Sequence, residues 1–371
     1  MEDGHLGDGI MKLSSLRDYL QQRFGGKVEI LYAKEMGRSL KVEKDELKGF
    51  GYGKPIEIEI QVNGDKHSLV LSSMRVQKGF GHDYFSDRAQ VLLWQYSAFN
   101  KLPRHVRALD VGYFTRDGEL FSAAKAEEFF LLMEKVNGRE YHFDLDRLRD
   151  GGELRELDIA RARALSDYLV EIHSQKHRDE ELYKRRIREL VGHGECIMGL
   201  IDSYPRDFEF ASPQDFCKIE QKCIEWRFKL RDNAHRLCVV HGDYHPWNVI
   251  FREGIDFTVL DRSRGEYGEP ADDVATMSMN YIFYSLQKYS ELKGEFKQLF
   301  DVFLNNYLEK TDDGEILKFM PPFYVFRALV IASPVWYPTL SPEVRVKLFN
   351  FIRNVLEVEE FNPQRVNELL K

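Results

Sequence analysis

The chain has 371 residues, enough for about two domains or lobes, because a single hydrophobic core usually stops growing at about 250 to 300 residues. Its 43% hydrophobic, 13% aromatic and 31% charged residues exclude a mostly disordered protein. The formal net charge of −8 comes without a long basic run, so the electrostatic basis for binding nucleic acid is missing.

The four cysteines indicate a reducing compartment. They form no CxxC pair, and the chain is far longer than a disulfide-stapled scaffold, so we expect reduced and mostly buried thiols. The cysteines are Cys196, Cys217, Cys223 and Cys238.

The chain ends and the apolar segments predict a soluble cytoplasmic protein. The opening MEDGHLGDGIMKLSS has neither the basic nor the apolar region of a secretory signal, and a start at Met11 stays open. The most apolar late segment, 323–338, is interrupted by Arg327 and Pro334 and is too short to span a bilayer. We therefore expect no membrane partner; the oligomeric state is left open.

The first elements predict an antiparallel β unit over about 40–75. An amphipathic stretch covers 13–24, and GFGYG (49–53) then leads into PIEIEIQV (55–62), whose strict apolar and polar alternation is typical of a half-buried strand. The pair Asn63-Gly64, the strongest short hairpin signal, precedes a second β-like run, HSLVLSSM (67–74).

One helix and two further strands are expected next. Apolar residues at helical spacing predict a helix over 85–101, ended by Pro103. The runs ALDVGYF (108–114) and EFFLLMEKV (128–136) are strand-like, and Asn137-Gly138 closes the second.

From there the pattern becomes helical. The segment 158–173 repeats apolar residues at the spacing of one buried helix face. Charged and aromatic helical stretches cover about 178–236, a strand-turn-strand pattern covers 238–261, and helices fill 271–371. The sequence thus predicts an α+β chain with a β-rich amino-terminal third.

Polar residues gather in the strand-turn-strand region. Two apolar strands in CVVHGDYHPWNVIF flank a loop with His241, Asp243, His245 and Asn248, and Asp261 ends the following strand, FTVLD. Phosphoryl transfer to a hydroxyl needs a carboxylate at the nucleophile and oxygen ligands for Mg²⁺. An Asp, an Asn five residues later and a second Asp supply that set.

The motif HGDYHPWN resembles the HGDxHxxN catalytic loop of the aminoglycoside phosphotransferase, choline kinase and homoserine kinase superfamily, relatives of protein kinases. EFFLLMEKVNG is similar to the family's fifth strand and hinge, and LDRSRGEYGEPADDVA to its metal-binding Asp and later Asp-containing helix start. The resemblance covers roughly 40–280 and implies a bilobal protein-kinase-like fold. It implies ATP-dependent, Mg²⁺-requiring transfer of phosphate to a small-molecule hydroxyl. The implied lobes are 1–136 for the nucleotide and 137–371 for the catalytic loop and acceptor.

The resemblance also implies roles for the residues near the loop. Asp243 would be the catalytic base, and Asn248 and Asp261 would hold magnesium. His241 would be structural, and Asp273 would brace the loop by hydrogen bonds to its backbone. For His245 a supporting role in the site and a simple loop hydrogen bond both stay open.

In the amino-terminal lobe the resemblance implies nucleotide contacts from several separate segments. The main chain of Glu134 and Val136 would meet the adenine. Gly49, Gly51 and Gly53 would cover the phosphates, or else belong to an ordinary hairpin. The alternative glycines at 79–81 are interpreted as the entry to the next helix.

Two departures from the family pattern concern charged residues. No lysine stands at the expected place in HSLVLSSMR, so Arg75 or Lys78 would have to replace it. The usual helix glutamate is also missing. Asp87 is the nearest candidate, with helix capping as an equal alternative.

Other charged and aromatic residues leave the acceptor unidentified. Arg262 and Arg264 could stabilise transferred charge, bind an anionic substrate, or belong to a solvated loop. Arg327, Trp336 and Tyr337 could line an acceptor pocket, although we interpret them first as packing residues. ATP and GTP are not distinguished.

Two other functions are compatible with part of the sequence pattern. A metal-dependent hydrolase could use His241, Asp243 and His245 as zinc ligands, but no second ligand group has a metal spacing. A pseudokinase or nucleotide-sensing module is the second alternative, and the missing lysine and glutamate are the reason to consider it. The retained Asp243, Asn248 and Asp261 argue against it.

Overall fold

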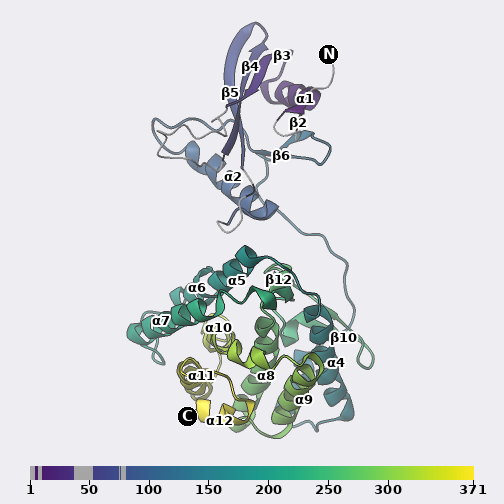
Figure 1. Ribbon diagram of the computed structural model, residues 1–371, viewed down its shortest axis with the longest axis vertical. Coiled ribbons are helices and arrows are strands. Elements are labelled where there is room, and N and C mark those ends of the chain that lie inside the picture. Colours follow the sequence, from purple (N-terminus) through teal and green to yellow (C-terminus); the bar gives the residue numbers. More distant parts are fainter. Residues whose placement is uncertain (1–4, 7–10, 37–52, 75, 77–80) are drawn as a thin grey trace. The chain divides into compact units, whose positions relative to one another are not determined.

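The computed structural model describes residues 5–6, 11–36, 53–74, 76 and 81–371, which divide into two compact units, 1–133 and 134–371 (Figure 1). Each unit is described by itself. The first is β-rich and the second mainly helical, so the predicted α+β class is confirmed.

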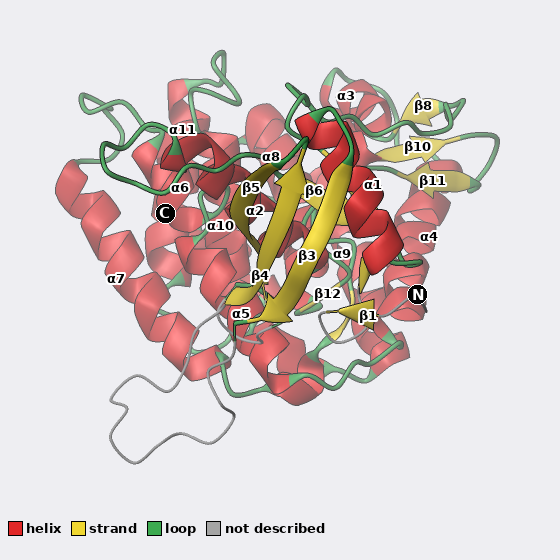
Figure 2. Ribbon diagram, turned by 90° about the horizontal axis from the view of Figure 1, so that it is seen from above, coloured by secondary structure: helices red, strands yellow, loops and turns green. Residues whose placement is uncertain are grey.

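A three-stranded antiparallel sheet forms the centre of the first unit. Its order is β3 (Val28–Glu35), β4 (Gly53–Val62) and β5 (Asp65–Met74), and α1 (Leu13–Phe24) lies along β3 (Figure 2). The alternation predicted for 55–62 is the burial pattern observed, because Ile56, Ile58, Ile60 and Val62 are all buried. They pack in one cluster with Leu16 and Leu20 of α1 and with Val28.

The turn between β4 and β5 has the predicted form. Asn63 and Gly64 both have positive φ angles, 51° and 103°, which a two-residue hairpin turn of this type requires. Val62 therefore pairs directly with Asp65.

The remaining elements of the first unit are one helix and short strand pairs. The helix predicted for 85–101 is α2 (Phe85–Phe99). The two strand pairs are β1 (His5–Leu6) with β2 (Met11–Lys12), and β6 (Gly112–Phe114) with β7 (Leu120–Ser122).

Two strand predictions in this region need correction. Only 112–114 of the run 108–114 is a strand. The run 128–136 is extended chain outside any strand, and its apolar side chains from Phe129 to Met133 are exposed. A strand needs a partner for its backbone as well as an apolar sequence, and no described strand pairs with this run.

The second unit is a helical assembly with two small sheets. Its principal helices are α3 (His142–Arg149), α4 (Glu156–His173), α5 (Glu180–Gly192), α6 (Ile197–Asp202), α7 (Pro213–Leu230), α8 (Ala271–Tyr289), α9 (Gly294–Thr311), α10 (Met320–Ala332), α11 (Pro342–Val355) and α12 (Val366–Leu369). Short 3-10 helices are η1 (Ala234–Arg236), η2 (Pro246–Asn248), η3 (Gly314–Lys318) and η4 (Pro363–Arg365). The predicted helices over 158–173, 178–236 and 271–371 are thus present.

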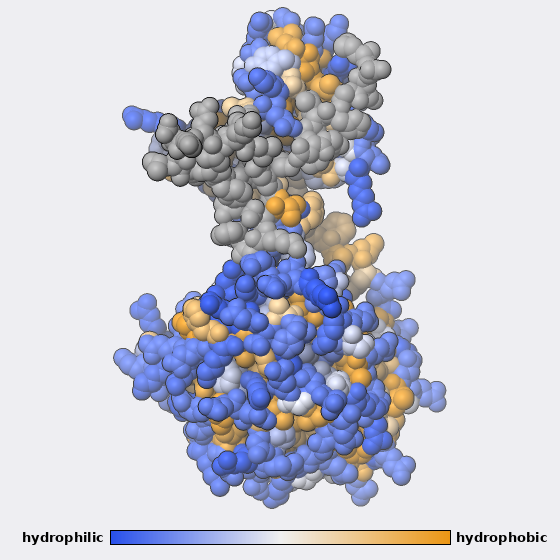
Figure 3. Space-filling view, viewed as in Figure 1, coloured by the Kyte–Doolittle hydropathy of each residue, from blue (hydrophilic) through white to orange (hydrophobic). Residues whose placement is uncertain are grey.

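Helix α8 is the core of this unit. Every residue from 273 to 286 is buried, and α8 packs against α9 and α10. Helix α4 packs on α9, and α11 packs on α10. The surface in Figure 3 is mainly hydrophilic over this unit, with scattered apolar residues.

The two sheets of the second unit hold the strands around the predicted catalytic loop. One has the order β11 (Phe257–Val259), β10 (Val249–Phe251), β8 (Arg139–Glu140), and the other pairs β9 (Cys238–Val239) with β12 (Tyr267–Gly268). The strands that flank the loop, β9 and β10, therefore belong to different sheets.

Two further features of the fold concern the cysteines and the apolar character of the helices. All four cysteines are unpaired; Cys217 is exposed and the other three are buried. Among the described residues, no helix combines the length and apolar character needed to cross a membrane.

Candidate active site

The predicted catalytic loop joins β9 to β10 and turns at Gly242. This glycine has φ +85°, and a Cβ at its position would approach the Cβ of Arg264 to 3.3 Å. A residue with a side chain would therefore be strained and crowded there. The Nδ1 atom of His241 accepts a hydrogen bond from the backbone N–H of Asp243 at 3.3 Å, which closes the turn.

The carboxylate of Asp273, in the first turn of α8, binds the same loop. Its two oxygens accept hydrogen bonds from the backbone N–H groups of His241 at 2.7 Å and Gly242 at 2.8 Å. The Nε2 atom of His173 lies 3.1 Å from Oδ2, and Tyr307 binds the other ring nitrogen of His173. Complete burial alone would raise the pKa of Asp273, but these hydrogen bonds and the neighbouring histidines lower it. The carboxylate therefore stays charged and links α4, α8 and the loop.

Three basic side chains surround the carboxylate of Asp243. The Nε2 atom of His245 lies 3.4 Å from Oδ2, and Arg327 and Arg264 reach within 3.7 Å and 3.9 Å of Oδ1. Burial alone would raise the pKa of Asp243, but His245 and the two guanidinium groups outweigh it and hold the pKa below its usual range. Asp243 is therefore ionised at neutral pH.

His245 is held in one orientation. Its Nδ1 accepts a hydrogen bond from the backbone N–H of Trp247, so in the neutral ring Nε2 carries the proton and donates toward Asp243. Burial and the charge of Arg327 lower the pKa of His245, which favours this neutral form. His245 therefore makes a hydrogen bond within the loop and also lies close to the carboxylate of Asp243.

Asn248 and Asp261 are the oxygen groups that fit a magnesium ion. The amide nitrogen of Asn248 donates a hydrogen bond to the backbone carbonyl of Asp243 at 3.0 Å. The amide oxygen of Asn248, Oδ1, is then the atom that could bind a metal. Asp261 follows β11 with φ 55° and is exposed, and the backbone N–H of Leu260 binds the carbonyl of Asn248 at 2.8 Å. Magnesium is usually held by one or two such protein oxygens together with substrate phosphates, so the donor set fits.

The two arginines after Asp261 have different surroundings. Arg262 donates to the backbone carbonyls of Val240 at 2.9 Å and Glu266 at 2.7 Å, so it stabilises the loop. The guanidinium of Arg264 lies over the ring of Phe326, 4.7 Å from its centroid, and faces Asp243.

Two residues near Asp243 were not expected to be there. Arg327 of α10, interpreted from the sequence as a packing residue, contacts Asp243. Asp272 has a buried Oδ1 without a hydrogen-bond partner among the described residues, and burial raises its pKa to about 8. The paired aspartates in EPADDVA were the available signal for Asp272; contacts with α10 cannot be found from local sequence.

The residues predicted to bind the nucleotide lie in several separate segments of the chain. Glu134 is exposed and Val136 is half-buried in extended chain, and Gly53 begins β4 opposite Met74. Gly49, Gly51 and Arg75 lie outside the described residues, as do Lys78 and most of the 79–81 segment. Asp87 accepts a hydrogen bond from the backbone N–H of Tyr84 at 2.9 Å, the geometry of the capping alternative.

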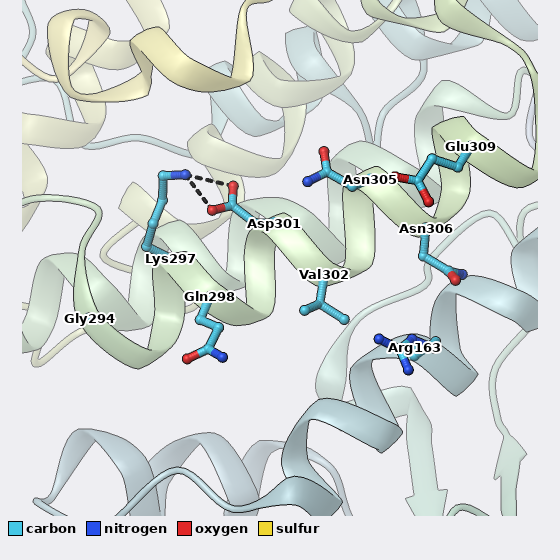
Figure 4. Close-up of a pocket in the computed structure, with 9 residues that line it drawn as sticks. All are labelled: Arg163, Gly294, Lys297, Gln298, Asp301, Val302, Asn305, Asn306 and Glu309. Carbon is cyan, nitrogen blue, oxygen red and sulfur yellow. Dashed lines mark hydrogen bonds and ion pairs between the residues drawn. The ribbon is translucent and has the colours of Figure 1, made fainter.

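One cavity of the second unit is separate from these residues. It has a volume of about 550 Å³ and is lined by α9 side chains and by Arg163 of α4 (Figure 4). Lys297 and Asp301 in its wall form an ion pair at 2.6 Å. None of the predicted site residues lines it.

The zinc alternative finds no support in this geometry. Within the part of the chain that the structure describes, no group of three or more His, Cys, Asp and Glu side chains is arranged to hold a metal. The Nδ1 atoms of His241 and His245 both accept backbone hydrogen bonds instead.

Comparison with known proteins gives one family match. Residues 99–287, just over half of the chain, match the model of the phosphotransferase enzyme family, and this range includes the whole loop and Asp273. No curated protein sequence matches the chain.

Several solved structures are similar at low identity. An amicoumacin kinase in complex with AMP-PNP and Ca²⁺ is 15% identical, with 84% of this chain and 89% of that chain covered and a TM-score of 0.43. A glucosamine kinase in complex with glucosamine, ADP and phosphate is 17% identical, with 63% of each chain covered and a TM-score of 0.36. A choline kinase from Streptococcus pneumoniae is 10% identical, with 92% and 98% covered and a TM-score of 0.34.

Proposed function

The chain belongs to the phosphotransferase enzyme family, as the predicted resemblance implied, and from that membership we propose that it transfers the γ-phosphate of ATP to a hydroxyl group of a small molecule. One observation carries the proposal. Asp243, on a loop anchored by Asp273, is an ionised carboxylate next to Asn248 and close in sequence to Asp261.

The transfer makes one bond and breaks one. The acceptor oxygen forms a bond to the γ-phosphorus, while the bond from that phosphorus to the bridging oxygen breaks and ADP leaves. The hydroxyl proton passes first to Asp243 and then to solvent. Since its pKa is lowered, Asp243 is a weak base, and its main contribution is to accept the hydrogen bond of the hydroxyl and orient its oxygen for attack.

Asn248 and Asp261 would hold the magnesium ion that the family uses. When bound, the ion neutralises negative charge on the phosphate oxygens. The residues of this chain provide hard oxygen donors, and the hydrogen bond from Asn248 to the Asp243 carbonyl keeps the amide in a fixed orientation.

The remaining nucleotide contacts belong to the same proposal. The main chain of Glu134 and Val136 would bind the adenine, and Gly49, Gly51, Gly53 and Arg75 the phosphates. His241 and Asp273 would fix the loop, and His245 would keep Asp243 charged and oriented.

The test is ADP release measured with a coupled assay against a library of hydroxylated metabolites. Wild-type protein should release ADP only with Mg-ATP and certain acceptors, and Asp243→Asn protein of equal thermal stability should lose that release. A protein that binds Mg-ATP but releases no ADP with any acceptor would instead be a nucleotide-sensing module.

A further inference from the structure

Arg327 is a buried cation that makes no hydrogen bond to a described residue. Its side chain is 6% exposed, and its Nε is buried without a partner among the described residues. A guanidinium has five N–H donors, and an ionised group that is buried with its donors unsatisfied is costly. Its contact with Asp243, at 3.7 Å, is longer than a hydrogen bond.

Arg264 approaches the same oxygen of Asp243. It reaches Oδ1 of Asp243 at 3.9 Å, and its guanidinium makes no hydrogen bond to a described residue. Its side chain is 25% exposed, so a ligand can reach it from solvent. Arg262, on the same loop, is different because two backbone carbonyls accept from it.

The charges around Asp243 do not cancel. Two guanidinium groups face one ionised carboxylate, to which the neutral His245 already donates. Asp272 is near both arginines, but burial raises its pKa to about 8, so at neutral pH it is mostly uncharged. Arg264 also has the acidic Glu195 among its neighbours, but the ionised carboxylate of Asp243 is shared by two guanidinium groups.

We propose that the acceptor carries an anionic oxygen group, a carboxylate or a phosphate, which Arg327 and Arg264 bind while the acceptor hydroxyl faces Asp243. This inference rests on the proposed function and names the class of its substrate. The paired N–H donors of a guanidinium can bind two oxygens of a carboxylate or of a phosphate at the same time. Ligand oxygens would also satisfy the donors that the protein leaves without partners.

The test is a panel of acceptors that differ in charge. It pairs D-glycerate and glycerol 3-phosphate with glycerol, and D-gluconate with D-glucose, and adds choline as a cation. The kcat/KM of at least one anionic acceptor should exceed that of its uncharged partner about 10- to 100-fold, the size of one or more charge-assisted hydrogen bonds. The carboxylate and phosphate members of the panel distinguish the two anions.

Two substitutions of Arg327 and one control variant locate the effect. Arg327→Gln should lower the ratio of anionic to uncharged kcat/KM by at least about tenfold, with Arg327→Lys between it and the wild type. Arg353 of α11 is partly exposed and donates a hydrogen bond to the Phe210 carbonyl, so Arg353→Gln should leave the ratio unchanged.

The outcomes are separable. If only uncharged or cationic acceptors are phosphorylated, or if the anionic preference survives in Arg327→Gln, the inference is wrong and the proposed function stands. If no acceptor and no condition yields ADP, both fail. The wild-type panel decides the matter even if Arg327→Gln does not fold.

Discussion

At the scale of single residues, neutralising Asp243 and neutralising Asp261 should have different effects on nucleotide affinity and turnover. Asp243 faces the basic side chains, and Asn248 binds only its backbone carbonyl. Asp243→Asn should therefore keep Mg-ATP affinity within a few-fold while turnover falls about 10²- to 10⁴-fold, the usual loss for a positioned acid or base. Titration calorimetry and steady-state kinetics measure the two quantities.

Asp261→Asn provides the contrast, because it removes a negative charge from the proposed metal site. Nucleotide affinity and turnover should fall together. Asp301→Asn, on the surface of α9, should change neither. Loss of nucleotide binding in Asp243→Asn with intact binding in Asp261→Asn would reverse the two assignments.

Asp272 gives a pH dependence of stability. Its pKa in the folded chain is about 8, above the ordinary 3.8, so between these values the folded state holds a proton that the unfolded state has released. The free energy of unfolding therefore falls as pH rises through this window. Asp272→Asn resembles the protonated acid, so its Tm should exceed that of the wild type at pH 8, and the two should converge toward pH 4. Parallel Tm curves from pH 4 to 8 would show that the carboxyl is charged throughout.

Much of the candidate site was available from the sequence, because the loop residues from His241 to Asn248 are close in the chain and share a recognisable spacing. The basic side chains around Asp243 could not be predicted from the sequence. Arg327 comes from a helix 84 positions later, and only the packing of α10 on α8 brings it near.

At the scale of elements, the hydrogen bonds of Asp273 connect α8 to the predicted catalytic loop. Asp273→Ala removes acceptors for two backbone N–H groups and for His173. Hydrogen bonds to a charged group contribute about 1.5 to 3 kcal/mol each, so unfolding free energy should drop by several kcal/mol. Urea denaturation measures the loss.

The control for this prediction is Asp301→Ala. Its ion pair with Lys297 is partly exposed, and such pairs contribute about 0 to 1 kcal/mol. Equal unfolding free energies for Asp273→Ala and Asp301→Ala would remove the anchoring role of Asp273.

Elements with a regular buried face were the predictable ones. Strand β4 and helix α4 bury one face each, and that face is visible as a repeat in the sequence. Strand β3 was not predicted, since only Val28 of its eight residues is buried. The pairing of β9 with β12 also depends on contacts between residues distant in the chain.

At the scale of the whole molecule, Mg-ATP should stabilise the folded chain as one ligand. A ligand that binds only the native state adds about 2.7 kcal/mol at 100 times its Kd, which raises the Tm by several degrees. Because Asn248 and Asp261 would bind the metal together with the phosphates, EDTA should abolish most of the shift. A Tm shift with ATP that is unchanged by EDTA would show that the metal assignment is wrong.

The most direct measurement follows the γ-phosphorus itself. With an acceptor from the panel, ³¹P NMR of the reaction should show the γ-phosphate of ATP converted into a phosphate monoester of the acceptor, one for each ADP formed. The Asp243→Asn protein should show little of this product. If ATP yields only ADP and inorganic phosphate at every acceptor concentration, or is not consumed at all, the chain is not the phosphotransferase proposed above.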